Sequence, residues 1–174
     1  MTRGYGIPNP NESWRFFSVA GVYARGRDPS LPLASEGRAG YAHHMPLVRI
    51  DLRKGRSPEY RAEVADVVYR AMLDVLKVPD KDRFIIITER AAEEMQFDRE
   101  YLGIHRTDEC IFIQVTLNAG RTVEVKQTFY KAIAGGLHDR LGLRREDIFI
   151  NLIEVAKENW SFGNGEAQYA VTVH

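Results

Sequence analysis

Residues 47–68 read LVRIDLRKGRSPEYRAEVADVV, and residues 112–133 read FIQVTLNAGRTVEVKQTFYKAI. The two stretches align without a gap at an offset of 65 residues, and the same offset carries Glu89 onto Glu154. Two copies of such a unit indicate a duplicated supersecondary structure in one compact domain, since a solenoid requires at least three repeats. The duplication therefore decides the fold.

The composition limits the class of protein. The chain has 174 residues, 44% hydrophobic and 28% charged, as in an ordinary soluble globular protein. Its formal net charge is zero, so no nucleic acid and no anionic membrane is expected as a partner. The one cysteine, Cys110, is interpreted as a buried, unreactive thiol. No signal peptide and no apolar run long enough to span a membrane is evident, which predicts a cytoplasmic protein.

Residues 1–45 differ from the rest of the chain. They contain six glycines, four prolines and four serines, which disfavour regular structure. We interpret this segment as a poorly ordered extension, or as upstream sequence included by a mis-assigned start codon. The domain is predicted to occupy residues 46–174, with repeats at 46–109 and 110–174.

Each repeat is predicted to form a β-α-β unit. In the first, residues 47–52 alternate as a strand does, Ser57 and Pro58 suit a helix start, and residues 84–88 (FIIIT) form a buried strand. In the second, the expected strands are residues 110–117 and 148–155, with a helix between them.

The second helix is expected over residues 123–141, with Thr122 as its N-cap. The pair Gly135 and Gly136 weakens this helix, which indicates close packing at that point. Two such units predict an α+β fold in which a four-stranded sheet carries both helices on one face. The other face is expected to be covered by further subunits.

The strand beginning Met45-Pro46, the Gly-Arg-Ser helix entry and the buried strand ending Ile-Thr-Glu resemble the tautomerase superfamily. The pattern PLVRIDLRKGRS…IIITE is similar to 4-oxalocrotonate tautomerase. The fused double unit and the tail NWSFGNG at residues 159–165 resemble malonate semialdehyde decarboxylase and its relatives more closely.

The resemblance implies that Pro46 is the catalytic group, exposed as an N-terminus after removal of the methionine. An N-terminal proline is a secondary amine, which can act as a base or an acid near neutral pH, whereas a proline within a chain is an amide. In this chain Pro46 is internal. Either residues 1–45 are absent from the working protein, or the chain lacks this chemistry and Pro46 only begins a strand.

The resemblance also implies substrate-binding residues. Arg121 matches an arginine that binds the substrate carboxylate, and Arg56, its mate in the repeat, matches a substrate-binding arginine of the single-unit tautomerase. The decarboxylase carries two arginines in the turn that contains Arg121, whereas here Asn118 or Ala119 replaces the first. This departure disfavours decarboxylation. The alternative interpretation of Arg121 is a solvated charge at the helix start, and Arg56 ranks lower because the two sites of a fused chain need not both survive.

Asp82 matches the catalytic aspartate of the decarboxylase, where it orients a water or the substrate. The alternative is a structural loop residue, which the presence of Asp147 at the same place in the second repeat favours. Trp160 and Phe162 are predicted to wall the site and exclude water, or else to form ordinary core or subunit contacts.

The expected activity is a keto–enol tautomerase, an isomerase acting on a small 2-oxo acid. The alternatives are a decarboxylase or hydratase of a small 3-oxo or unsaturated acid, and a non-catalytic member with a blocked proline. No cofactor and no metal are expected, because no metal-ligand spacing and no phosphate-binding loop is evident. Three chains of two units each would match the hexamers of the single-unit family, which predicts a homotrimer.

Overall fold

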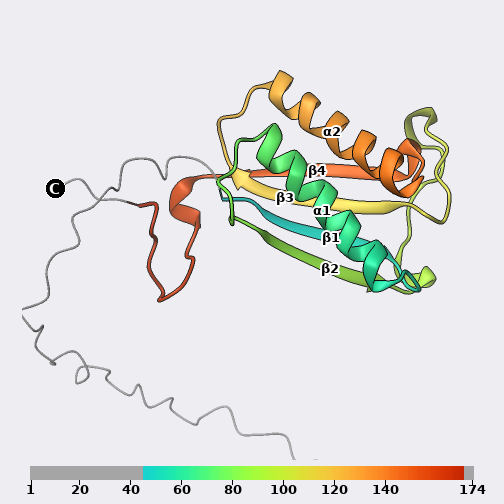
Figure 1. Ribbon diagram of the computed structural model, residues 1–174, viewed down its shortest axis with the longest axis horizontal. Helices are drawn as coiled ribbons and strands as arrows, with labels where there is room; N and C mark the ends of the chain where they lie inside the picture. The colour runs from blue at the N-terminus through green and yellow to red at the C-terminus, as the bar shows by residue number, and fades with distance from the viewer. Residues whose placement is uncertain (1–44, 171–174) are drawn as a thin grey trace, which may run out of the picture. The chain divides into compact units, whose positions relative to one another are not determined.

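A computed structural model describes residues 45–170 of the chain. The predicted N-terminal extension, apart from Met45, lies outside the described residues. The described part contains a four-stranded sheet and two long helices (Figure 1). No helix within it is long and apolar enough to cross a membrane.

The sheet has the strand order β2-β1-β3-β4. The parallel pair β1 and β2 is joined to the parallel pair β3 and β4 by antiparallel pairing of β1 with β3. The elements are β1 (Leu47–Arg53), α1 (Pro58–Asp74), β2 (Phe84–Arg90), β3 (Ile111–Asn118), α2 (Val123–Leu141) and β4 (Ile148–Val155). This arrangement confirms the predicted α+β class and the two β-α-β units.

Both helices begin as the sequence predicts. The Ser57 hydroxyl accepts a hydrogen bond from the Tyr60 N–H at 3.2 Å, and Thr122 caps α2 in the same way. The turns before these caps contain Gly55 and Gly120, at φ 111° and 117°, where a side chain would be strained. The repeated glycines therefore serve the turn geometry.

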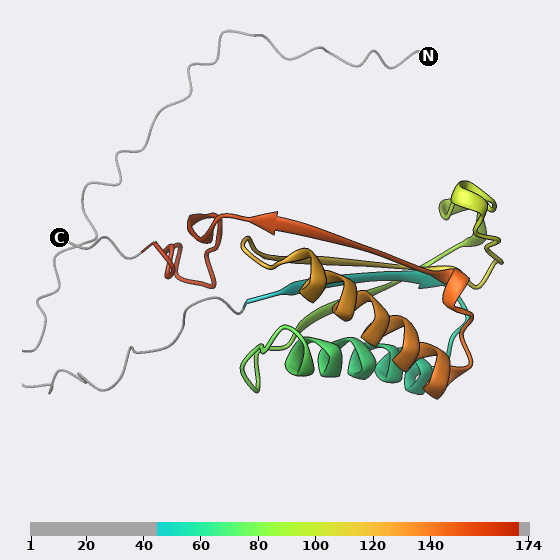
Figure 2. The ribbon, with the colours of Figure 1, turned by 90° about the horizontal axis from the view of Figure 1, so that it is seen from above.

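The core lies between the helices and one face of the sheet (Figure 2). The alternating residues Val48, Ile50 and Leu52 of β1 are almost completely buried against the helices. At Gly136 the two helices are so close that an added Cβ would lie 2.7 Å from a methyl carbon of Val67. The close packing predicted from the glycine pair is thus confirmed at Gly136.

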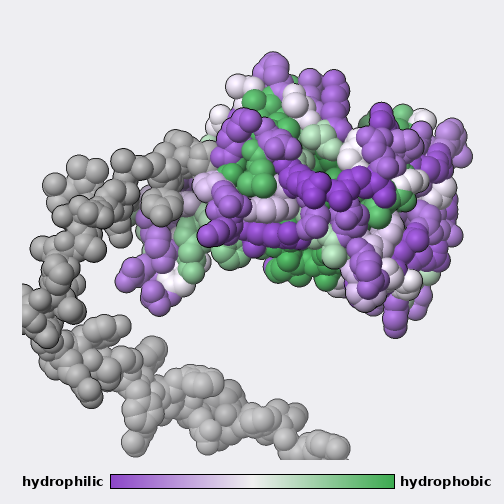
Figure 3. All heavy atoms as spheres, viewed as in Figure 1, coloured by the Kyte–Doolittle hydropathy of each residue, from purple (hydrophilic) through white to green (hydrophobic). Residues whose placement is uncertain are grey.

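Within residues 45–170, no long helix covers the other face of the sheet (Figure 2). Apolar side chains on its outer strands remain exposed, including Phe84 (50%), Ile86 (43%) and Phe149 (41%). Figure 3 shows hydrophobic side chains along the edge near β2. Coverage of this face by another subunit stays a prediction.

Candidate functional site

One end of the sheet gathers most of the predicted site residues. Because β1 and β2 run parallel and β3 and β4 run in the opposite direction, the starts of the first pair meet the ends of the second. Pro46 precedes β1, Asp82 precedes β2, Arg121 follows β3 and Trp160 follows β4. These residues therefore lie at the same end, toward the left of Figure 1.

Pro46 is buried at the start of one of the two central strands. The register of β1 with its two neighbours, continued by two residues, places Met45 level with Asp82 on one side and with Asn118 on the other. In the described chain Met45 is bonded to the Pro46 nitrogen, which is an amide and carries no basic lone pair.

Asn118 connects the turn after β3 to the segment after β4. Its side chain is 1% exposed, and Oδ1 accepts a hydrogen bond from the Trp160 indole Nε1 at 2.7 Å. Its main-chain oxygen accepts a hydrogen bond from Nη1 of Arg121 at 2.8 Å. Within residues 45–170 the Nδ2 group of Asn118 has no hydrogen-bond partner. Asn118 therefore contacts two predicted site residues, Trp160 through its side chain and Arg121 through its main chain, and its side-chain amide retains a donor without a partner in this part of the chain.

Arg121 lies partly buried in this turn. Burial lowers the pKa of its guanidinium, while the negative charge of Glu154 acts in the opposite direction. The guanidinium nevertheless stays protonated, as arginine side chains in proteins do. The Asn118 carbonyl therefore orients a fixed positive charge in a partly desolvated place, where a guanidinium can bind a carboxylate.

Asp82 lies partly buried in the loop before β2. Burial raises the pKa of its carboxyl group to about 6, because the charged form is poorly solvated there. Its Oδ1 atom has no hydrogen-bond partner within the described chain. A carboxyl group in this state exchanges a proton close to neutral pH, which suits a catalytic acid or base.

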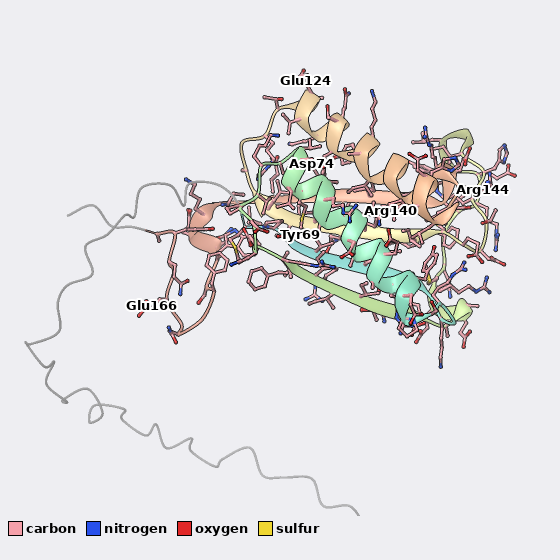
Figure 4. All side chains as sticks on the ribbon, viewed as in Figure 1. Tyr69, Asp74, Glu124, Arg140, Arg144 and Glu166 are labelled. Carbon is pink, nitrogen blue, oxygen red and sulfur yellow. The ribbon has the colours of Figure 1, made fainter. Side chains whose placement is uncertain are left out.

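Aromatic side chains follow β4 and stack in a row. The rings of Trp160 and Phe162 are 5.6 Å apart and nearly parallel, and Phe162 meets Tyr169 edge-on at 4.9 Å. Gln168 closes the loop between them by accepting from the Phe162 N–H and donating to the Gly163 oxygen. In Figure 4, Glu166 marks this loop, which projects away from the strands.

Tyr169 brings this aromatic row close to the carboxyl group before β2. Burial raises the pKa of Tyr169, and the negative charge of Asp82 raises it further. The segment after β4 is therefore hydrogen-bonded to Asn118 through Trp160, and its Tyr169 lies within electrostatic range of Asp82. Tyr169 and Asn118 were not predicted as site residues, although the replacement of an arginine near Asn118 was a visible signal.

The opposite end of the sheet holds the residues that the repeat matches to Pro46, Asp82 and Arg121, in different surroundings. Arg56, predicted to bind substrate, lies at this end and is ion-paired with Glu109. Asp147, the mate of Asp82, is completely buried and accepts hydrogen bonds from the Thr107 N–H and hydroxyl at 2.6 and 2.8 Å. Ile111 takes the place of Pro46. Within one chain, Arg56 is thus separated from the other predicted site residues.

No group of three or more His, Cys, Asp or Glu side chains within residues 45–170 is arranged to hold a metal ion. Cys110 is buried, and its thiol pKa is raised to about 11, chiefly by desolvation, so the predicted unreactive character is consistent with its surroundings.

Family models described as tautomerase enzymes match residues 46–104 and 82–163. The probable tautomerase YusQ of Bacillus subtilis (strain 168) is 42% identical over 124 residues, which cover 71% of this chain and 98% of the relative. The probable tautomerase YrdN of the same organism is 34% identical over 125 residues, 72% of this chain and 96% of the relative.

The chain is also similar to solved structures of malonate semialdehyde decarboxylases and of a fused 4-OT protein. The FG41 malonate semialdehyde decarboxylase inhibited by 3-bromopropiolate is 41% identical, with a TM-score of 0.66 over 71% of this chain and 93% of that one. A second malonate semialdehyde decarboxylase, studied for decarboxylase and hydratase activities, is 30% identical at the same TM-score, over 71% of this chain and 95% of that one. A symmetric trimer of fused 4-oxalocrotonate tautomerase shares the fold at 22% identity and a TM-score of 0.59, over 69% of this chain and 94% of that one.

Proposed function

The chain belongs to the tautomerase family, and we propose that it interconverts the enol and keto forms of a small 2-oxo acid, with Pro46 as the N-terminal general base and acid. The observation that carries the proposal is the position of Pro46. It begins a central strand, with Asp82 on one side and the turn containing Arg121 on the other.

A free amine at Pro46 fits this chemistry. A model α-amine has a pKa of about 7.7–8.0, and both burial and the nearby positive charge of Arg121 favour its neutral form. The neutral amine accepts the enol hydroxyl proton and returns a proton to C3, so the net reaction is an isomerisation. Arg121 binds the carboxylate, which fixes the reacting carbon near the amine.

The aromatic side chains support this role. Trp160 and Phe162 stack on each other, and Phe162 is 38% exposed in the single chain. Their proposed role is to cover a bound substrate and exclude water from it, which strengthens the electrostatic interactions of Arg121 with its carboxylate. Asp82, protonated in part near neutral pH, donates to a substrate oxygen or exchanges a proton with it.

Two observations favour decarboxylation as the second candidate function. Malonate semialdehyde decarboxylases are among the similar structures, at 41% and 30% identity. The raised pKa of Asp82 also suits a group that holds a carboxylate substrate or a water. Against it, the turn after β3 provides one arginine, so we rank tautomerisation first.

The active form is proposed to be a homotrimer that begins at Pro46. The exposed apolar face of the sheet, with Phe84 and Phe149, would be buried between subunits. Light scattering on residues 46–174 tests the assembly, and a stable monomer at micromolar concentration would contradict it.

The activity is tested with protein beginning at Pro46, assayed for ketonisation of phenylenolpyruvate and for release of CO2 from malonate semialdehyde. We expect efficient ketonisation and weak decarboxylation, and we expect Pro46→Ala to lower the ketonisation rate at least 100-fold, in the range of lost acid–base catalysis. Efficient CO2 release with slow ketonisation would instead establish the decarboxylase.

A further inference from the structure

We propose that Asn118 binds the substrate, donating a hydrogen bond from Nδ2 to the 2-oxo oxygen, and that it thereby selects 2-oxo acids over plain carboxylates. The inference rests on the proposed function and concerns the same site. Three observations carry it: the fixed orientation of the amide, the position of Asn118 beside Met45, and its connection to Arg121.

The orientation of the amide follows from its partner. An indole N–H can only donate, so the atom of Asn118 that lies 2.7 Å from Trp160 Nε1 must be the oxygen. Nδ2 then points elsewhere, and it has no partner within residues 45–170 although the side chain is 1% exposed. A buried donor without a partner costs about 1–3 kcal/mol, so such a group calls for an acceptor.

The register indicates where this acceptor can bind. The recorded pairing of β1 begins at Leu47, opposite Phe84 of β2 and Thr116 of β3. Continued by two residues, this register puts Met45 level with Asp82 and with Asn118. Side chains directly opposite each other in an antiparallel pair, such as β1 with β3, share one face, with Cβ atoms roughly 4.5–5.5 Å apart. A chain that begins at Pro46 lacks Met45. The space between Asp82 and Asn118, next to the Pro46 nitrogen, is then open to substrate.

The chemistry of this space fits a 2-oxo acid. Arg121 is hydrogen-bonded through Nη1 to the Asn118 main-chain oxygen, so the cation and the amide donor belong to one turn. A 2-oxo acid presents its carboxylate and its 2-oxo oxygen on adjacent carbons, which matches a cation beside a neutral donor. As the enol loses its proton, charge grows on this oxygen, and a donor aimed at it stabilises the transition state.

The test compares two competitive inhibitors of ketonisation by residues 46–174. Oxamate has a 2-oxo oxygen on a carbonyl that resists attack by the Pro46 amine, whereas propionate has a similar length and lacks this oxygen. These residues contain the whole buried core, and 124 residues of the chain match 98% of a relative's length, so the unit is expected to fold. Circular dichroism verifies the fold of each variant.

We expect the wild type to prefer oxamate about tenfold, the factor that corresponds to one hydrogen bond, and Asn118→Ala to abolish this preference. Trp160→Phe removes the donor that orients the Asn118 amide but keeps Nδ2, so it should reduce the preference to a value between those of the wild type and Asn118→Ala. Arg121→Ala should weaken both inhibitors alike. If Asn118→Ala does not fold, Asn118→Asp, which keeps the acceptor for Trp160, supplies the same ratio.

Retention of the full preference in a folded Asn118 variant would overturn the assignment. This outcome is separate from failure of the proposed function. If the proposed function fails, the wild type does not ketonise enols. Binding of oxamate and propionate to the wild type and the Asn118 variants is then compared by calorimetry.

Discussion

The indole Nε1 of Trp160 donates a hydrogen bond of 2.7 Å to Oδ1 of Asn118, and this bond attaches the segment after β4 to the end of β3. Because both residues belong to the part of the chain around Pro46, the bond fixes a wall of the proposed site. It also determines which atoms of the Asn118 amide remain available to a ligand.

Replacing Trp160 tests the energetic weight of this bond. Trp160→Phe keeps an aromatic ring but leaves the buried Oδ1 of Asn118 without its donor, so we expect a loss of about 1–3 kcal/mol in the free energy of unfolding. Urea denaturation measures this. In an Asn118→Ala background the same change should cost clearly less, and equal costs in both backgrounds would show that the bond contributes nothing.

Arg121 is predicted to bind the substrate carboxylate. Arg121→Ala should reduce kcat/KM for carboxylate substrates by an amount equivalent to about 2–4 kcal/mol, mainly through KM, because a partly buried ion pair is lost. Arg56→Ala is the matched control, since Arg56 is ion-paired with Glu109 at the opposite end of the sheet. An equal loss of activity toward an ester of the same substrate would argue against carboxylate binding.

Asp82 is predicted to make stability depend on pH. Its pKa is raised from 3.8 to about 6 in the folded chain, so ionisation costs more there than in the unfolded chain. The resulting penalty is absent below about pH 4, grows as the pH rises from about 4 to about 6, and stays constant above that. Asp82→Asn should therefore stabilise the protein at pH 8, on the order of 1 kcal/mol after allowance for solvent screening, and have little effect at pH 4.

Urea denaturation of the wild type and Asp82→Asn at these two pH values measures the difference. Asp147→Asn is the contrasting control. Asp147 accepts two hydrogen bonds from Thr107, so its replacement should destabilise the protein. Stabilisation by Asp82→Asn at pH 4 as large as that at pH 8 would contradict the raised pKa.

Gly136 is predicted to be required for helix packing. Gly136→Ala should destabilise the protein by about 1–3 kcal/mol, because the new methyl group would collide with Val67, whereas Gly135→Ala has open space and should stabilise α2 slightly. Thermal denaturation compares the two variants. If Val67→Ala does not lessen the cost of Gly136→Ala, the collision is not its cause.

The fold could be predicted from the sequence because its signals are local. Alternating apolar residues in β1, the caps Ser57 and Thr122 and the repeat itself each report on a short stretch, and the strands and helices lie within a few residues of the predicted bounds. The close approach at Gly136 was also predicted, since a glycine inside a helix has few other causes.

The site was only partly predictable, because its properties depend on neighbours far apart in the sequence. The sequence alone did not separate Asp82 from Asp147. Within residues 45–170, Oδ1 of Asp82 has no hydrogen-bond partner, whereas Asp147 accepts two hydrogen bonds. The role of Asn118 requires the register of β1 with β3 and the return of Trp160. The separation of Arg56 from Pro46 likewise follows from strand direction, which a motif does not reveal.

The central claim is that a free Pro46 amine performs the chemistry. The most direct test measures ketonisation of phenylenolpyruvate by residues 46–174 and by the full 174-residue chain, both verified by intact mass. We expect the shorter protein to be active and the full chain, whose Pro46 nitrogen is an amide, to be at least 100-fold slower, the lower bound for lost acid–base catalysis. Equal rates for the two proteins would contradict the account.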